Sequence, residues 1–264
     1  MKKLVCLGVM VIGALAAQAD GVTNSWIGAD GAAWGTAANW SAGHVPDGDE
    51  YVIFPDTGSS YSINVDGDYQ IGCFYVDYRR KVNGDYDMSG ANTTVVDFTL
   101  TGTGKVIATG NNTSQHCVRI NRRLVMDGPT LDLTARNVVL LIYNGMIVKA
   151  GSACYLTFLT LHWNNTYLNV DGGLVNVASR LQYRRSGSAI RLSDGAFLSA
   201  ASLVTAGDAA DPRLAVTVNG GLMTIGTTTI VSGCSLTFNG GEYRFRGATT
   251  IDAVPCGPGF SASR

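Results

Sequence analysis

The chain has 264 residues, 33 of them glycine, and charged side chains make up only 15% of it. Its formal net charge of −1 argues against a nucleic-acid partner, because proteins that bind nucleic acid carry a strongly basic face. Few Glu and Lys beside many Gly, Thr, Asn and Val predict an all-β protein and exclude a mainly helical one.

Residues 1–19 have the parts of a secretory signal peptide. Two lysines precede the apolar run LVCLGVMVIGALA, and Ala17 and Ala19 are the small residues of a cleavage site. We therefore expect export by a Sec-type signal, cleavage before Asp20, and an extracellular or cell-surface location. No later stretch is long and apolar enough for a helix that crosses a bilayer, so we expect no transmembrane segment in the mature chain.

The segment that follows, residues 20–55, is rich in tryptophan. Trp26, Trp34 and Trp40 are separated mainly by Gly, Ala and Asn. Clustered aromatic rings can bind a sugar in solvent, or they can cover the open apolar end of a repetitive fold. The architecture of the rest of the chain decides between these two interpretations.

The C-terminal half repeats a pattern of short strands and glycine turns. AVTVNGGLMTIGTTTI begins at Ala215 and SLTFNGGEYRFRGATTI begins at Ser235, and superposing their Asn-Gly-Gly triplets aligns their apolar residues. YLNVDGGLVNVASRL is an earlier copy, and SDGAFLSA is a looser one. The turns at positions 171, 194, 219 and 239 are thus 23, 25 and 20 residues apart.

Each unit alternates apolar and polar residues on both sides of a tight turn, which is typical of strands with one buried face. Such a unit buries little alone but forms a continuous core when stacked on copies of itself. We therefore predict a right-handed parallel β-helix (solenoid) over residues 56–264, with residues 20–55 as its N-terminal cap segment. A period of about 22 residues gives roughly nine coils. An antiparallel sandwich or barrel is the alternative.

The tryptophan segment has the pattern W-x-G-x5-W-x4-N-W-x2-G-x2-P, followed by an acidic turn and YVIF. It resembles the N-terminal segment of large bacterial surface proteins built from autotransporter-associated β-strand repeats. The residues that carry the resemblance are Trp26, Gly28, Trp34, Asn39, Trp40, Gly43, Pro46, Asp49, Val52 and Phe54. The resemblance implies a secreted, surface-associated β-solenoid and supplies no catalytic residues.

Proteins of that kind usually continue into a membrane-embedded barrel or a sorting tail, whereas this sequence ends in VPCGPGFSASR. An uncapped last coil would expose a strand edge, so we expect the solenoid to be truncated at the C-terminus. At the other end, a solenoid needs a cover for its first coil. This need favours the cap interpretation of the three tryptophans over sugar binding.

Three arginine pairs are separated by 43 and 62 residues, close to two and three coils, so we expect them along one side of the solenoid. Arginine binds carboxylate or sulfate through two parallel hydrogen bonds and stacks on rings, which suits an acidic glycan. The alternative is that each pair is a polar strand end that covers an apolar neighbour. The pairs are Arg79 and Arg80, Arg122 and Arg123, and Arg184 and Arg185.

Other candidate sites are weaker. The closest carboxylate pairs lie in segments typical of solvated loops, so we assign no catalytic residue. These pairs are Asp85 with Asp87, and Asp208 with Asp211. The scattered His and Cys match no metal motif, so we expect no metal and no cofactor.

Five cysteines follow the signal segment, so at least one is free or pairs between chains. Cys234 and Cys256 are one coil apart by sequence and could form a disulfide. Cys73 and Cys117 are 44 residues apart, which at two coils is too far for one.

The sequence therefore predicts a secreted or cell-surface β-solenoid passenger with a non-catalytic adhesion or structural role. Its expected partners are host or environmental glycans or other surface proteins. The alternative is a carbohydrate-active β-helix, a lyase or glycoside hydrolase that acts on an acidic polysaccharide. Fold alone does not choose between these functions.

Overall fold

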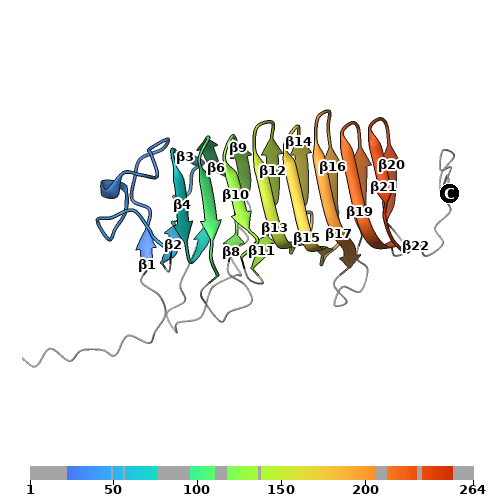
Figure 1. The fold of residues 1–264 in the computed structure, drawn as a ribbon, viewed down its shortest axis with the longest axis horizontal. Helices are drawn as coiled ribbons and strands as arrows, with labels where there is room; N and C mark the ends of the chain where they lie inside the picture. Colours follow the sequence, from blue (N-terminus) through green and yellow to red (C-terminus); the bar gives the residue numbers. More distant parts are fainter. Residues whose placement is uncertain are drawn as a thin grey trace, which may run out of the picture.

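The computed structural model describes residues 23–48, 50–55, 57–76, 96–110, 118–135, 138–205, 213–230 and 234–251. Almost all regular structure in these ranges is β-strand, beside one short 3-10 helix, η1 (Ala37–Asn39). Figure 1 shows the strands stacked along one long axis, from β1 at the blue end to β22 at the red end. No helix in the described part is long and apolar enough to span a bilayer.

The strands form three faces that the chain visits in turn, and the pairings between strands are parallel. Face 1 contains β1 (Thr23–Ser25), β2 (Tyr51–Phe54), β5 (Cys73–Val76), β8 (Val118–Ile120), β11 (Val139–Ile142), the second halves of β13 (Ala153–Leu161), β15 (Leu174–Tyr183), β17 (Phe197–Thr205) and β19 (Leu222–Ile230), and β22 (Thr249–Ile251).

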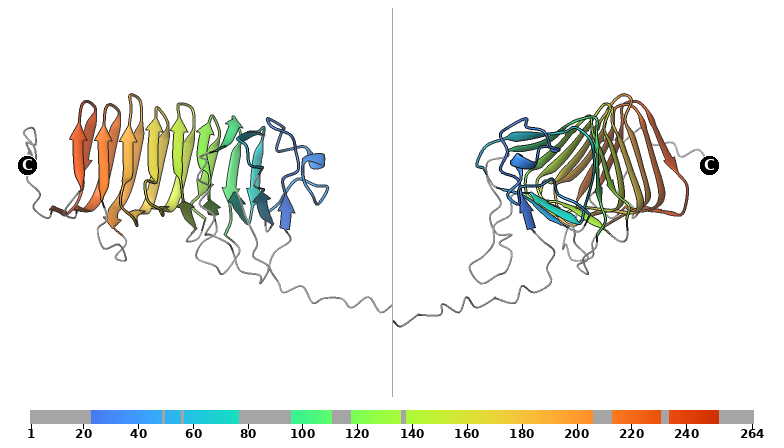
Figure 2. Two further views of the ribbon diagram at one scale, coloured as in Figure 1. Left: turned by 180° about the vertical axis from the view of Figure 1, so that it is seen from behind. Right: turned by 60° about the vertical axis from the view of Figure 1, so that its left-hand side comes forward.

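Face 2 contains β3 (Tyr61–Val65), β6 (Asp97–Gly102), β9 (Arg123–Asp127), β12 (Gly145–Lys149), β14 (Tyr167–Asp171), β16 (Ser188–Leu192), β18 (Leu214–Val218) and β20 (Ser235–Phe238). Face 3 contains β4 (Asp68–Ile71), β7 (Lys105–Ala108), β10 (Thr130–Leu133), the first halves of β13, β15, β17 and β19, and β21 (Glu242–Phe245). Figure 2 shows the resulting three-sided tube from two further directions.

This arrangement confirms the predicted parallel β-helix and the register read from the repeats. Val216 pairs with Leu236, as the superposed Asn-Gly-Gly triplets predict. Eight strands stack on face 2, so the described chain makes about seven turns, and the prediction of roughly nine coils is wrong. The coils are not all of one length, because Phe74 pairs with Val118, 44 positions later, whereas Leu124 pairs with Met146, 22 positions later.

The core lies inside the tube, where every second residue of each strand points inward. On face 2, one continuous column of fully buried side chains is formed by Phe98, Leu124, Met146, Leu168, Ile190 and Val216. The turn between faces 2 and 3 requires glycine. Gly221 has a φ of +74°, and a Cβ there would lie 2.3 Å from the carbonyl oxygen of Ala196 in the preceding coil.

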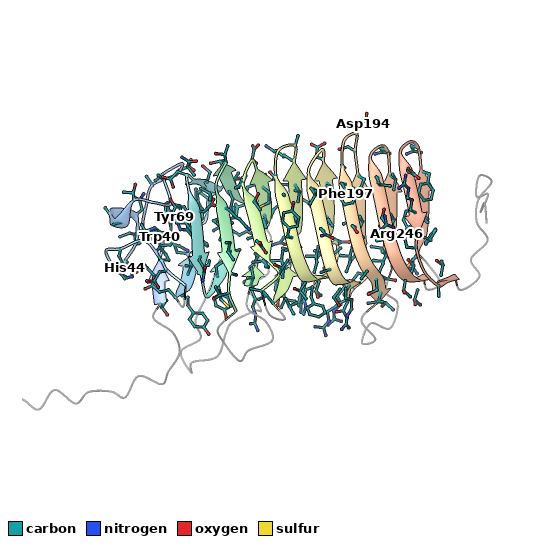
Figure 3. The ribbon with its side chains drawn as sticks, viewed as in Figure 1. Trp40, His44, Tyr69, Asp194, Phe197 and Arg246 are labelled. Carbon is teal, nitrogen blue, oxygen red and sulfur yellow. The ribbon has the colours of Figure 1, made fainter. Side chains whose placement is uncertain are left out.

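The tryptophan segment covers the N-terminal end of the tube, as Figure 2 shows in blue. Trp26, Trp34 and Trp40 are each at most 3% exposed, and the ring of Trp40 lies 5.0 Å from each of the other two. The Trp40 indole N–H donates to the Trp34 carbonyl oxygen at 2.7 Å. Trp34 also packs at 5.6 Å from Phe54 of the first coil and stacks on Tyr69, and Figure 3 labels Tyr69 and Trp40 at this end of the tube. The three rings are therefore a buried cap, and no sugar can stack on them.

Candidate functional site

The structure places two of the three arginine pairs at one corner of the tube, where face 1 passes into face 2. Arg122 and Arg123 follow β8, and Arg184 and Arg185 follow β15, three coils further along face 1. The 62-residue interval between these pairs is thus three coils, as expected. Arg79 and Arg80 lie outside the described residues. The step from β5 to β8 that spans them is one coil, so the expected two-coil interval is wrong.

Arg122 and Arg123 bind other parts of the protein. Arg122 is 1% exposed, its Nη1 donates to the Ser59 carbonyl oxygen at 2.6 Å, and its guanidinium lies 5.5 Å from the centre of the Tyr61 ring. Arg123 forms a double hydrogen bond to Asp97, with its Nε at 2.5 Å and its Nη2 at 2.8 Å, and this contact raises the pKa of Arg123. The guanidinium groups of Arg122 and Arg123 thus join one coil to another. The other pair is closer to solvent: Arg184 is half-buried and Arg185 is exposed.

Beside Arg184, the corner holds a column of polar and aromatic side chains from successive coils. Tyr143, His162 and Arg184 each follow a face 1 strand, and their backbone N–H groups continue the ladder by donating to the preceding coil at 2.8–3.0 Å. The ring of Tyr143 lies 4.6 Å from that of His162. Trp163, the next residue, is 39% exposed and lies 6.5 Å from the Tyr143 ring. We call Tyr143, His162, Trp163, Arg184 and Arg185 the basic corner.

Arg184 contacts the imidazole of His162. Arg184 Nη1 lies 3.4 Å from His162 Nδ1, and a guanidinium can only donate. In this contact His162 Nδ1 is therefore the acceptor. Burial raises the pKa of Tyr143, although the nearby guanidinium groups of Arg119 and Arg184 act in the opposite direction. The Nδ1 lone pair of His162 thus faces a donor, and burial favours the protonated hydroxyl of Tyr143.

The charge of this corner differs from that of the whole chain. The three segments that supply its residues contain three arginines and neither Asp nor Glu, although the chain has a net charge of −1. Another cationic contact, Arg180 at 5.7 Å from the centre of the Phe158 ring, extends the surface along face 1. The segments are residues 138–144, 158–166 and 180–188. Guanidinium groups beside an exposed indole suit a ligand that has both carboxylate or sulfate groups and ring faces.

The doubled arginines of this corner stand out in the sequence, whereas Tyr143, His162 and Trp163 do not. Their spacing does match the coil length, because Tyr143 and His162 are 19 positions apart and His162 and Arg184 are 22 apart. This spacing places the three residues at one corner only when the coil boundaries are known.

The candidate catalytic carboxylates Asp85, Asp87, Asp208 and Asp211 lie outside the described residues. Several described carboxylates have cationic partners in neighbouring coils: Asp127 binds Lys149 at 2.8 Å, and Asp132 binds Lys105 at 2.7 Å. Within the described ranges, no cluster of three or more His, Cys, Asp or Glu could hold a metal ion.

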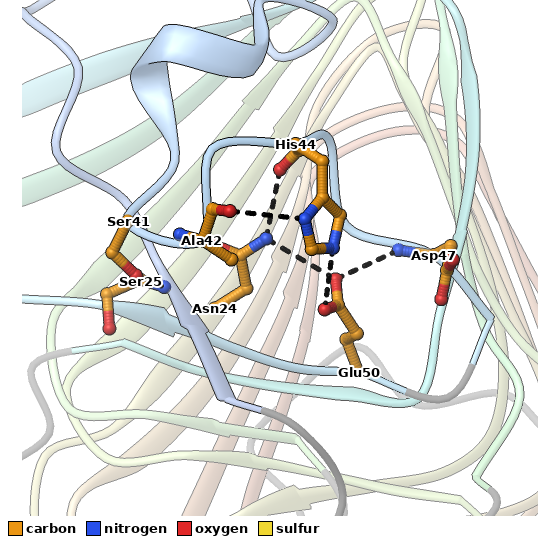
Figure 4. A network of polar contacts seen from close by, with 7 residues as sticks. All are labelled: Asn24, Ser25, Ser41, Ala42, His44, Asp47 and Glu50. Carbon is orange, nitrogen blue, oxygen red and sulfur yellow. Dashed lines mark hydrogen bonds and ion pairs between the residues drawn. The ribbon is translucent and has the colours of Figure 1, made fainter.

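A second polar network joins the cap to the first coil (Figure 4). His44 Nε2 lies 2.9 Å from Glu50 Oε1, and His44 Nδ1 lies 3.3 Å from the Ala42 carbonyl oxygen. Both ring nitrogens face acceptors, so the charged imidazolium fits this position, and the Glu50 hydrogen bond raises the pKa of His44. Asn24 is fully buried, and its side chain donates to Glu50 and accepts from the Ala42 N–H. All the contacts are internal, so we interpret this network as a latch for the cap.

The cysteines correct two of the sequence-based expectations. Cys234 is in no disulfide, so the expected Cys234–Cys256 bond is wrong. Cys73 is disulfide-bonded, and neither of the other described cysteines, Cys154 and Cys234, is its partner. The two-coil separation assumed for Cys73 and Cys117 is also wrong, because the step from Phe74 to Val118 is one coil.

Comparisons with family models, with curated proteins and with solved structures each found no match. The resemblance of the tryptophan segment to bacterial surface proteins therefore stays a prediction.

Proposed function

We propose that this protein is an exported, non-catalytic β-solenoid passenger that adheres to acidic polysaccharide through the basic corner. The observation that carries the proposal is the column of Tyr143, His162 and Arg184, with Trp163 exposed beside it and no carboxylate in the segments that build it. Coils repeat about every 4.8 Å, so the corner presents its groups in a row along the tube. A row of groups matches a polymeric ligand better than a single small molecule.

The physical basis of binding is the sum of two contributions. The guanidinium groups of Arg184 and Arg185 provide charge-assisted hydrogen bonds to carboxylate or sulfate. The exposed indole of Trp163 provides an apolar face on which a sugar ring can lie. Because the arginines are at the surface, the ionic part of the affinity should fall as salt is added.

Of the two enzyme alternatives, a lyase or a glycoside hydrolase, the lyase would use the same corner, since it needs a cation for the uronate carboxylate and a base for the ring proton. The geometry favours binding without chemistry. The lone pair of His162 Nδ1 is occupied by Arg184, and burial raises the pKa of Tyr143 and so keeps its hydroxyl protonated. A lyase would release unsaturated products from polygalacturonate, which ultraviolet absorbance detects.

Binding of polygalacturonate, a homopolymer of uronate, tests the proposal by calorimetry. Replacing Arg184 and Arg185 together by Ser removes two charge-assisted contacts of about 1.5–3 kcal/mol each, so affinity should fall at least tenfold. The control is Arg191→Ser, which removes an exposed arginine from face 2 and should leave affinity unchanged. Equal affinity of the double variant and the control would reject the basic corner as the binding site.

The export part of the proposal has its own test. The full chain is expressed in a bacterial host, and the N-terminus of the extracellular or periplasmic product is sequenced. We expect it to begin at Asp20. A cytoplasmic product that retains residues 1–19 would contradict export.

A further inference from the structure

The two ends of the solenoid differ in how they are covered. At the N-terminal end, the three tryptophans bury the first coil. At the other end, the inward-facing residues of the last coil are open, with Phe238 42% and Phe245 37% exposed. Their partners one coil earlier, Val218 and Ile225, are fully buried. Among the described residues no further coil stacks on this one, so these two aromatic side chains lie open at the end of the described stack.

The backbone of the last coil also offers unpaired hydrogen-bonding groups. Among the described residues, β21 pairs only with β19. The N–H groups of Glu242 and Arg246 donate to the carbonyl oxygens of Gly221 and Ile225 in the preceding coil, at 2.9 and 2.8 Å. Because the direction of the backbone N–H and C=O groups alternates along a strand, those of Tyr243 point along the tube axis, away from the preceding coil. An edge of this kind accepts another strand.

The side chains of β21 are complementary to a second copy of β21. Glu242 and Arg244 point outward on either side of Tyr243, and within one chain they contact each other at 2.5 Å. In an antiparallel pair centred on Tyr243, Glu242 of each strand lies opposite Arg244 of the other. The outward-pointing backbone of Tyr243 matches this register, in which the two central residues exchange both hydrogen bonds.

We propose that two copies of this chain associate tail to tail through their last coils, about a two-fold axis at Tyr243. The contact is isologous: the same surface is used by both copies, and the assembly closes at a dimer. The last coil of one copy cannot stack on the first coil of another, since the cap tryptophans cover the N-terminal end of the tube. The pairing brings Phe238 and Phe245 of each copy against the apolar end of the other. It is independent of glycan binding, which uses the face 1 and face 2 corner.

Sedimentation velocity of the full chain tests the proposal. The wild type should sediment with twice the chain mass of 27.8 kDa, less any removed signal. Glu242→Arg and Arg244→Glu each place like charges opposite each other, so each variant alone should be monomeric. Arg191→Glu, a charge reversal on face 2, is the matched control and should stay dimeric. Circular dichroism checks that every variant is folded.

Mixing the two single variants gives the decisive result. The Glu242→Arg chain then presents two arginines to the two glutamates of the Arg244→Glu chain, so the mixture should form a heterodimer. The double variant E242R/R244E should also regain the dimer. A contact within one chain cannot be rescued by mixing. A monomeric wild type, or a mixture that stays monomeric, would overturn the proposal. Conversion of a monomer into a dimer by removal of residues 252–264 would also overturn it, because the chain's own tail would then cover the end.

Discussion

Replacement of Trp40 by Ala tests the role of the tryptophan cap. Trp40 is 1% exposed, contacts the rings of Trp26 and Trp34 at 5.0 Å, and donates its indole N–H to the Trp34 carbonyl oxygen. Truncation of a fully buried Trp costs about 3–5 kcal/mol. Stability in a solenoid is mainly a sum of neighbour contacts, so we expect this loss at the cap and first coil rather than throughout the stack.

The distribution of tryptophans provides the assay. Of the four in the chain, only Trp163 lies outside the cap, so a Trp163→Phe background confines intrinsic fluorescence to the cap. With a urea slope of about 1–3 kcal/mol per M, Trp40→Ala should shift the fluorescence transition down by at least about 1 M. The circular dichroism transition of the strands should move less.

The matched control is Ile27→Ala, in the same segment but 63% exposed, which should change stability by less than about 0.5 kcal/mol. If the midpoints of Trp40→Ala and Ile27→Ala agree, the cap does not hold the end of the tube and the reasoning fails.

Three further predictions follow from local chemistry. The pKa of His44 is raised above its ordinary 6.5, so its stabilisation is complete below about pH 6.5 and is lost as pH rises through the raised value. The cap should thus melt at a lower temperature at high pH, and His44→Gln should remove that dependence. Cys154 is buried, with its thiol pKa raised by desolvation, so native protein should be alkylated at Cys234 and not at Cys154. Gly221→Ala should lower the free energy of unfolding by at least about 2 kcal/mol more than Gly151→Ala, because both have positive φ but only Gly221 abuts backbone.

The sequence predicts the fold well where the backbone itself imposes a requirement. The turns near Asn219 and Asn239 need glycine for positive φ, so the same triplet recurs and reveals the register. The apolar residues on either side must fill one continuous core, which fixes their alternation. Both requirements act in every coil and leave a readable pattern.

Other features leave no such pattern. Extra residues between β5 and β6 lengthen one coil without altering the stack, so a count by constant period gives too many coils and separates Cys73 from Cys117 too far. The corner side chains Tyr143, His162 and Arg184 point out of the core, so no packing rule makes them alike. Their proximity follows from the coil boundaries, which sequence periodicity locates only approximately.

The most direct test of the proposed function is acrylamide quenching of Trp163 in the wild-type chain. Trp26, Trp34 and Trp40 are buried, so the quencher reaches mainly the exposed indole of Trp163. Saturating polygalacturonate should protect this fluorescence, added salt should weaken the protection, and neutral dextran should give none. If polygalacturonate leaves the quenching of Trp163 unchanged, or if dextran protects it equally, the basic corner is not a site for acidic polysaccharide.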